Sequence, residues 1–191
     1  MAISLNKGQT LSLQKSDGSA LSKVTLGLGW DVAKTKRGLF GGNKEIDLDA
    51  SAIIFDGAGR ALDTVWYGGL KSTDGSVKHA GDNLTGEGDG DDEQIFIDLN
   101  RVDSKAKSIV FVITSYSGDK FDSIKNVFAR VVDDSTGAEL VRYQLAEGGS
   151  NTASVVAKLT RTASGWEFAA IGEPTNGKTV NDVTSVAARF L

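Results

Sequence analysis

Cysteine is absent from the sequence, and histidine, methionine and proline occur once each. Without cysteine the chain cannot form disulfides, thiolate zinc sites, iron–sulfur clusters or a thiol nucleophile. No apolar run approaches the ~18 residues that a membrane-spanning helix needs. The first residues also lack the charged and apolar regions of a secretory signal. These absences predict a soluble cytoplasmic protein.

The sequence also lacks clusters of Lys and Arg interleaved with aromatic residues, so it does not predict a nucleic-acid-binding face. Its formal net charge is −4, and the six acidic residues between positions 82 and 93 more than account for that value. The acidity is therefore local. No long internal repeat is evident, and 191 residues fit one domain, spanning 1–191, with a substantial hydrophobic core.

The most informative stretch is the run 81–93, which reads G-D-N-L-T-G-E-G-D-G-D-D-E. No Lys or Arg occurs between Lys78 and Arg101 to neutralise its six carboxylates. Two like charges ~4 Å apart repel by ~1 kcal/mol even in water. Glycines leave the backbone carbonyls free to turn inward, and Ca²⁺ takes ~6–8 oxygen ligands in flexible geometry. The run therefore predicts a calcium-binding loop, with a merely solvated acidic loop as the alternative.

A second acidic stretch lies at 45–55. Strand periodicity would place Asp47, Asp49 and Ser51 on one face and the apolar residues on the other. Neighbouring carboxylates on a strand are costly unless they meet a cation. From this stretch alone, a cation site and a polar outer face remain equally open.

The remaining pattern is mostly that of β-strands. A continuous β-branched run at 108–116 is typical of a strand buried on both faces, and the glycines of 23–31 indicate a bulge or a close backbone approach. Segment 100–107 is a short helix or a turn, and short helical segments are expected at 121–126 and 180–191, the latter with Asp182 as N-cap. Many strands at ~8–12-residue spacing predict a mainly β fold, a β-sandwich of two antiparallel or mixed sheets with a few short helices. The expected strands are 3–5, 10–13, 23–31, 45–55, 64–67, 95–99, 108–116, 127–132, 139–145, 153–162 and 165–172.

Three segments carry a resemblance to a known family. G-L-G-W-D at 27–31, D-L-D-A-S-A at 47–52 and the acidic run at 81–93 resemble the TerD family, the tellurite-resistance and calcium-binding stress proteins of bacteria. The resemblance covers essentially the whole chain. It implies a β-sandwich with calcium sites at one end of the sheets and a part in resistance to tellurite and other chemical stress. It also implies partners among other stress and tellurite-resistance proteins.

Carried over residue by residue, the resemblance predicts a set of oxygen ligands. Strand ends would bring Asp31, Asp47 and Asp49 to the acidic loop. The oxygen ligands of the strand ends and the loop together are more than one Ca²⁺ ion needs, so two adjacent ions are expected. The loop is not an EF-hand, because Asp91 is followed by Asp92 and Glu93 where the EF-hand pattern D-x-D-x-D-G has a glycine after its third acid. The loop ligands would be Asp82, Asn83, Thr85, Gly86, Glu87, Gly88, Asp91, Asp92 and Glu93.

Other residues are assigned structural roles. Because Ca²⁺ prefers oxygen, His79 is expected to be structural at a strand end. Trp30 and Trp66 are expected in the core. The segment 34–44, basic and glycine-rich, is predicted to be a surface loop.

The function expected from these features is that of a non-enzymatic module whose calcium-ordered loop mediates binding or scaffolding. The alternative is a C2-like peripheral membrane module, in which Ca²⁺ bridges the acidic rim to anionic lipid and Leu39 and Phe40, with the basic residues around them, contact the surface. A metal-dependent phosphohydrolase is a third reading, disfavoured because the loop has no Lys or Arg to stabilise a developing anion. The absence of thiols also argues against direct reduction of tellurite.

Overall fold

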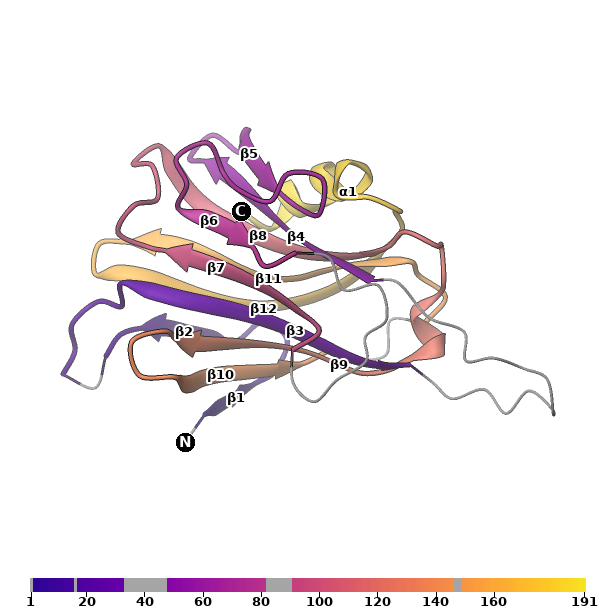
Figure 1. Ribbon diagram of the computed structural model, residues 1–191, viewed down its shortest axis with the longest axis horizontal. Coiled ribbons are helices and arrows are strands. Elements are labelled where there is room, and N and C mark those ends of the chain that lie inside the picture. Colours follow the sequence, from indigo (N-terminus) through magenta and orange to yellow (C-terminus); the bar gives the residue numbers. More distant parts are fainter. Residues whose placement is uncertain (1, 16, 33–47, 82–90, 146–148) are drawn as a thin grey trace.

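Two six-stranded sheets pack face to face (Figure 1). The computed structural model describes residues 2–15, 17–32, 48–81, 91–145 and 149–191, and for 31, 32, 123 and 125 only the backbone. The first sheet, here the β3 sheet, has the strand order β1-β10-β9-β3-β7-β6, and the second, here the β8 sheet, has the order β2-β12-β11-β8-β4-β5. The predicted β-sandwich is confirmed.

The strands of the β3 sheet are β1 (Ile3–Leu5), β3 (Lys23–Val32), β6 (Val77–His79), β7 (Glu93–Asp98), β9 (Ile124–Asp133) and β10 (Ala138–Gln144). Those of the β8 sheet are β2 (Thr10–Leu13), β4 (Leu48–Asp56), β5 (Ala61–Val65), β8 (Ala106–Ser115), β11 (Ala153–Thr162) and β12 (Gly165–Thr175). The helical elements are the 3-10 turns η1 (Phe121–Ser123) and η2 (Ala188–Phe190) and the α-helix α1 (Val180–Ala187).

The first two strands lie in different sheets, each at an edge. β1 pairs with β10 in parallel, with Ile3 opposite Val141, whereas β2 pairs antiparallel with β12. Among the described residues β1–β10 is the only parallel strand pair. The β3 sheet is therefore mixed and the β8 sheet antiparallel.

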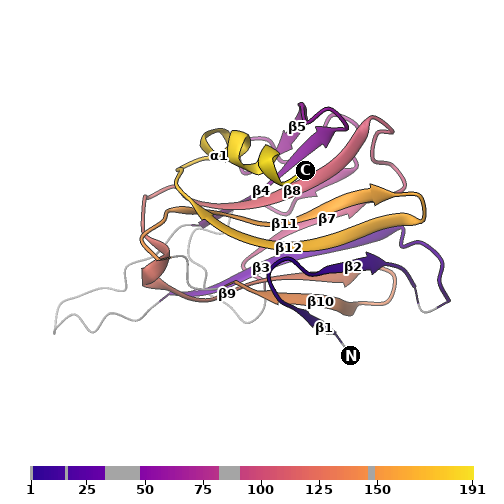
Figure 2. The same ribbon diagram turned by 180° about the vertical axis from the view of Figure 1, so that it is seen from behind.

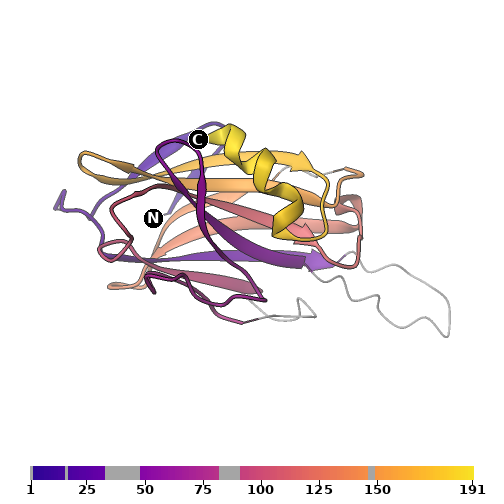
Figure 3. The same ribbon diagram turned by 90° about the horizontal axis from the view of Figure 1, so that it is seen from above.

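The β8 sheet is covered on both faces. Its inner face packs against the β3 sheet, and α1 lies across its outer face (Figures 2 and 3). Val110 and Val112 of β8 pack with Val180 and Val183 of α1 in a second apolar cluster. The two-sided burial predicted for 108–116 is thereby confirmed. Among the described residues, no helix is long and apolar enough to cross a membrane.

Several local predictions need correction. Segment 100–105 forms turns, one of the two predicted alternatives, but 106 and 107 already belong to β8. Only 121–123 of the expected helical turn is helical, because β9 already begins at Ile124. The N-cap of α1 is Thr179, not Asp182. The Asp182 carboxylate instead accepts the Thr179 N–H at 3.0 Å from position N3, which is the reciprocal geometry of a capping box.

The strand expected at 64–67 starts and ends earlier, as β5 (Ala61–Val65), so that only 64 and 65 were predicted correctly. β5 ends at Val65, and Trp66 closes a turn in which its backbone exchanges hydrogen bonds with Gly69 at 3.1 and 2.9 Å. Trp66 is only half-buried, against the cluster under α1, whereas Trp30 is buried in the main core as predicted.

Candidate functional site

The acidic run re-enters the β3 sheet beside the end of β3. Glu93 stands opposite Leu28, and the Asp92 N–H donates to the Leu28 carbonyl at 2.8 Å. The Asp92 carboxylate accepts the backbone N–H of Trp30 at 2.7 Å. The β3–β9 ladder shifts between Gly29 and Asp31, so the bulge predicted from the glycines is confirmed. These contacts bind the C-terminal end of the acidic run to the G-L-G-W-D segment.

Glu93 and His79 point from the β3 sheet to the edge of β4. Both side chains are 0 % exposed. The Ala50 N–H donates to Glu93 Oε2, and His79 Nε2 lies 3.2 Å from the Ala50 carbonyl oxygen. The last residue of β5, Val65, stands opposite Ala52 of β4. Ala50 therefore lies beyond the end of β5. The carboxylate and the imidazole thus bind β4 backbone groups where β5 has stopped, and they join the two sheets.

The hydrogen bonds of His79 fix its tautomer. The Gly81 N–H donates to His79 Nδ1 at 3.1 Å. Because Nδ1 accepts, the neutral ring carries its proton on Nε2 and donates it to the Ala50 carbonyl. Both ring nitrogens are therefore engaged, and Gly81, the residue before the acidic run proper, is held by a buried side chain.

One oxygen of Glu93 is exceptional. Glu93 Oε1 is buried and has no hydrogen-bond partner within the described part of the chain. A buried carboxylate oxygen without a partner costs considerable free energy, which a cation can recover. It is the described atom that most favours a cation at this end of the sandwich.

Asp91 has a different environment. Its side chain is 1 % exposed and forms an ion pair with Arg130 of β9, with Nε 2.6 Å from Oδ1 and Nη2 3.0 Å from Oδ2. Gln94 donates a further hydrogen bond to Oδ2 at 3.1 Å. The hydrogen bonds that Arg130 donates to Asp91 are the largest influence on the pKa of Arg130, and they raise it above the ordinary value.

The sequence argument did not find Arg130. No Lys or Arg lies near the acidic run in the sequence, but in the structure Arg130 contacts its end. Arg130 stands opposite Gly27 in the ladder between β3 and β9, and Asp91 packs directly over Gly27. A glycine facing a strand arginine was the only signal in the sequence, and it becomes readable only with the strand register.

Asp49 lies on the neighbouring strand. It is 3 % exposed, and Ser51 is 1 % exposed. Strand alternation places both on the face of β4 opposite Ala50, which lies in the core between the sheets. The shared face is confirmed, and its burial rules out a solvated polar surface.

The remaining predicted ligands fall outside the described residues. Within the described ranges, no group of three or more His, Asp or Glu side chains is placed to hold a metal ion. The described residues alone thus supply Asp49, Asp91, Asp92 and Glu93 as separate acids around one end of the sandwich. Lying outside are Asp47, Asp82, Asn83, Thr85, Gly86, Glu87, Gly88, the Asp31 side chain and the basic segment 34–44.

Known proteins agree with this fold and these segments. The TerD domain model matches residues 1–185. The chain is 48 % identical over 186 residues to tellurium resistance protein TerZ of Serratia marcescens, covering 96 % of this chain and 95 % of TerZ. It is 42 % identical over 198 residues to stress response protein SCP2 of Bacillus subtilis, covering 97 % and 98 %.

A solved structure supports the fold alone. The crystal structure of a homologue of telluride resistance protein (TerD) from Streptomyces coelicolor A3(2) matches with a TM-score of 0.71 at 23 % identity, over 88 % of this chain and 98 % of that chain. Together with the family match, this confirms the resemblance seen in the sequence. The chain belongs to the TerD family.

Proposed function

We propose that this chain is a calcium-binding, non-enzymatic module of tellurium resistance and stress response. Bound Ca²⁺ would order the acidic loop and the adjoining strand ends, and the ordered surface would bind or scaffold other proteins of the same response. The relatives named above as tellurium resistance and stress response proteins support the biological setting.

The observation that carries the proposal is the buried, unpartnered Oε1 of Glu93 within the described chain. His79 Nε2 lies 3.4 Å from the other oxygen, Glu93 Oε2, and Oε1 still has no partner in the described chain. A cation next to Glu93 would remove the cost, and the acidic run that leads into Glu93 has the composition to hold one.

The donor chemistry favours calcium over softer metals. Both nitrogens of His79 are already hydrogen-bonded, and the sequence has no cysteine. Only oxygen donors remain, which suits a hard cation such as Ca²⁺. We assign the ion to Asp92, Glu93, Asp49 and the oxygen donors of 82–88, with Asp31 and Asp47 approaching from the strand ends. About two ions would satisfy so many donors.

We assign Asp91 a structural role that differs from that of the calcium ligands. Both of its oxygens already accept hydrogen bonds from Arg130. It therefore anchors the end of the loop to the sheet. The same pair argues against an enzyme, because Arg130 is committed to Asp91 and is not available to stabilise a developing anion.

The proposal is tested by calorimetric titration of chelator-stripped protein with Ca²⁺, with Mg²⁺ as competitor, followed by thermal melting of each form. We expect micromolar binding and a raised Tm, because the ion binds only the folded chain. Glu93→Gln keeps the shape of the side chain and removes the charge, so it should weaken binding. Glu167→Gln on β12 serves as the matched control. No heat and no change of Tm in the original protein would show that the acidic loop is a solvated surface.

A further inference from the structure

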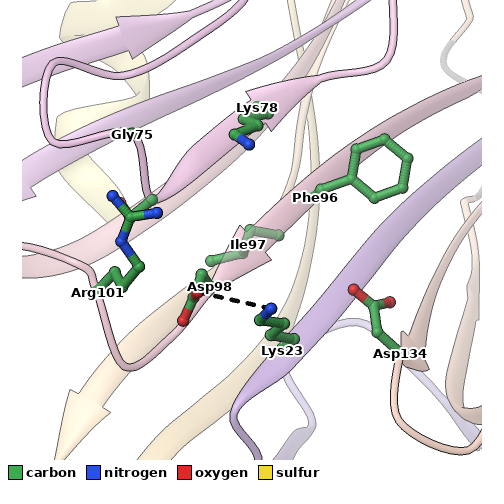
Figure 4. Close-up of a pocket in the computed structure, with 9 residues that line it drawn as sticks. Lys23, Gly75, Lys78, Phe96, Ile97, Asp98, Arg101 and Asp134 are labelled. Atoms are coloured by element: carbon green, nitrogen blue, oxygen red, sulfur yellow. Dashed lines mark ion pairs between the residues drawn. The ribbon is translucent and has the colours of Figure 1, made fainter.

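A cavity of about 180 Å³ lies on the outer face of the β3 sheet, away from the β8 sheet (Figure 4). Its lining includes Lys23, Lys78, Phe96, Asp98, Arg101 and Asp134. Phe96 is three residues along β7 from Glu93 and on the opposite face of the strand, ~10 Å away at the usual rise per residue. The cavity is therefore separate from the proposed calcium site.

Basic side chains converge at this cavity. Lys71 and Lys78 face each other across an isolated antiparallel bridge. The position that a Cβ on Gly75 would occupy lies 3.3 Å from Lys71 Nζ and 3.5 Å from Arg101 Nη2. Like charges placed directly opposite each other are destabilising, so this arrangement favours an anion between the cations.

No acidic side chain satisfies these three cations. In the described chain, Lys71, Lys78 and Arg101 have no carboxylate within ion-pair distance. In the same part of the chain, the Arg101 guanidinium donates to the Asp74 carbonyl oxygen, at 3.2 Å. Lys78 and Arg101 line the cavity, and Lys71 lies beside Gly75, which also lines it.

The carboxylates nearby are already engaged. Asp74 Oδ1 accepts the hydroxyls of Ser72 and Ser76, each at 2.7 Å, and its Oδ2 accepts the N–H of Asp103 at 2.9 Å. Asp134 accepts the Thr25 hydroxyl at 2.6 Å.

Asp98 forms only a weak ion pair at this cavity. Its carboxylate lies 4.0 Å from Lys23 Nζ, at the limit of an ion pair, and the Lys23 side chain is 62 % exposed. The lining thus carries three cationic side chains, Lys23, Lys78 and Arg101, against two carboxylates, Asp98 and Asp134.

An aromatic ring lies next to these cationic side chains. Phe96 is 39 % exposed, although Ile95 and Ile97 on either side of it are buried. In the ladders it stands opposite Lys78 on one side and Thr25 on the other. An exposed ring beside a basic surface offers a flat face on which a nucleobase can stack.

From this combination we propose that the cavity binds a mononucleotide, with its phosphate against Lys71, Lys78 and Arg101 and its base on Phe96. Lys and Arg side chains bind phosphate through charge-assisted hydrogen bonds. The volume is below the ~300–1,000 Å³ of pockets for drug-sized ligands, so the base lies partly outside the cavity on the exposed ring. This site is independent of the calcium proposal.

The test is a titration of the full chain with adenosine monophosphate, adenosine or inorganic phosphate, followed by amide NMR shifts. It is run with and without Ca²⁺, so that its outcome does not depend on the acidic loop. Adenosine monophosphate should shift the amides of Gly75, Lys78 and Phe96 in a saturable manner. It should bind more tightly than adenosine or phosphate.

Two surface variants separate the contributions. Lys78→Gln should weaken both adenosine monophosphate and phosphate by about tenfold, since it removes one charge-assisted contact. Phe96→Ser should weaken adenosine monophosphate by about tenfold through lost stacking and leave phosphate unchanged. Lys178→Gln and Tyr116→Ser, an exposed lysine and an exposed tyrosine away from the cavity, should change neither.

The proposal is overturned by any of three results. The first is the absence of saturable shifts around Phe96. The second is adenosine monophosphate binding that survives both Lys78→Gln and Phe96→Ser undiminished. The third is phosphate binding as tight as that of adenosine monophosphate, which would leave no role for the ring.

Discussion

The guanidinium of Arg130 donates hydrogen bonds to both carboxylate oxygens of Asp91, at 2.6 and 3.0 Å. This pair lies over Gly27, where a Cβ would come within 2.1 Å of Asp91 Oδ2. Three residues far apart in the sequence therefore form one anchor between β3, β9 and the end of the acidic run. The absence of a side chain at position 27 is a condition for the ion pair.

We expect Gly27→Ala to destabilise the protein by about 1–3 kcal/mol, because the added methyl group displaces the buried Asp91 carboxylate from Arg130. The measurement is urea unfolding. Gly57→Ala is the matched control, since a Cβ there meets nothing within 4 Å, and its effect should stay within about 0.5 kcal/mol. Equal stability of the two variants would contradict the requirement for glycine.

Asp91 and Arg130 should also be energetically coupled. A double-mutant cycle with Asp91→Asn and Arg130→Gln should give a coupling free energy of about 1–3 kcal/mol, because Arg130→Gln leaves the Asp91 side chain, which is 1 % exposed, without its counter-charge. Additive effects in the cycle would mean that the bidentate geometry contributes no net stability.

His79→Ala should lower the free energy of unfolding by about 2–4 kcal/mol, since it opens a buried cavity and removes the partners of the Ala50 carbonyl and the Gly81 N–H. Amide hydrogen exchange gives a local readout, in which Gly81 should lose protection. Lys78→Ala, one position away and exposed, should have little effect on stability. Unchanged protection at Gly81 would show that His79 does not hold the start of the acidic run.

Asp74 should contribute stability that depends on pH. Burial alone raises its pKa, but hydrogen bonds from Ser72 and Ser76 lower it more, from 3.8 to about 2. Because the folded-state pKa lies below the unfolded one, the contribution is present above ~pH 4 and is lost as the pH falls towards ~2. A shift of this size corresponds to about 2 kcal/mol.

Asp74→Asn tests that contribution. The stability difference between the original protein and the variant should be about 2 kcal/mol near neutral pH and should shrink as the pH falls from ~4 towards ~2. Denaturant unfolding at several pH values measures it. A difference that stays constant across this range would show that the carboxylate charge is not the source.

Local sequence patterns predicted a strand well where its burial can be read directly from its own residues. The uninterrupted apolar run at 108–116 lies in β8 (Ala106–Ser115) except for its last residue, the exposed Tyr116, and its burial on both faces could be predicted without knowledge of its neighbours. The prediction of the N-cap failed because two residues can bind the same backbone N–H groups at the start of the helix. Thr179 and Asp182 both bind the first turn of α1, and only the structure shows which of them is the N-cap.

The candidate site was predictable only in part for a different reason. Composition and family resemblance identified the acidic run and the strand ends beside it. The contacts of its described end depend on strand register: Arg130 is 39 residues from Asp91, and Ala50 is 43 residues from Glu93. Pairings at such separations leave no local pattern in the sequence.

The separation of β1 and β2 into different sheets has a consequence for biosynthesis. Both strands are made before the rest of the sandwich, yet their partners, β10 and β12, are among the last of its described strands to be made. Until β10 and β12 are made, β1 and β2 have no strand to pair with, and each sheet lacks one edge strand. Closure of the sandwich therefore waits for β12, and a nascent chain halted before β12 keeps hydrogen-bonding edges open to other chains.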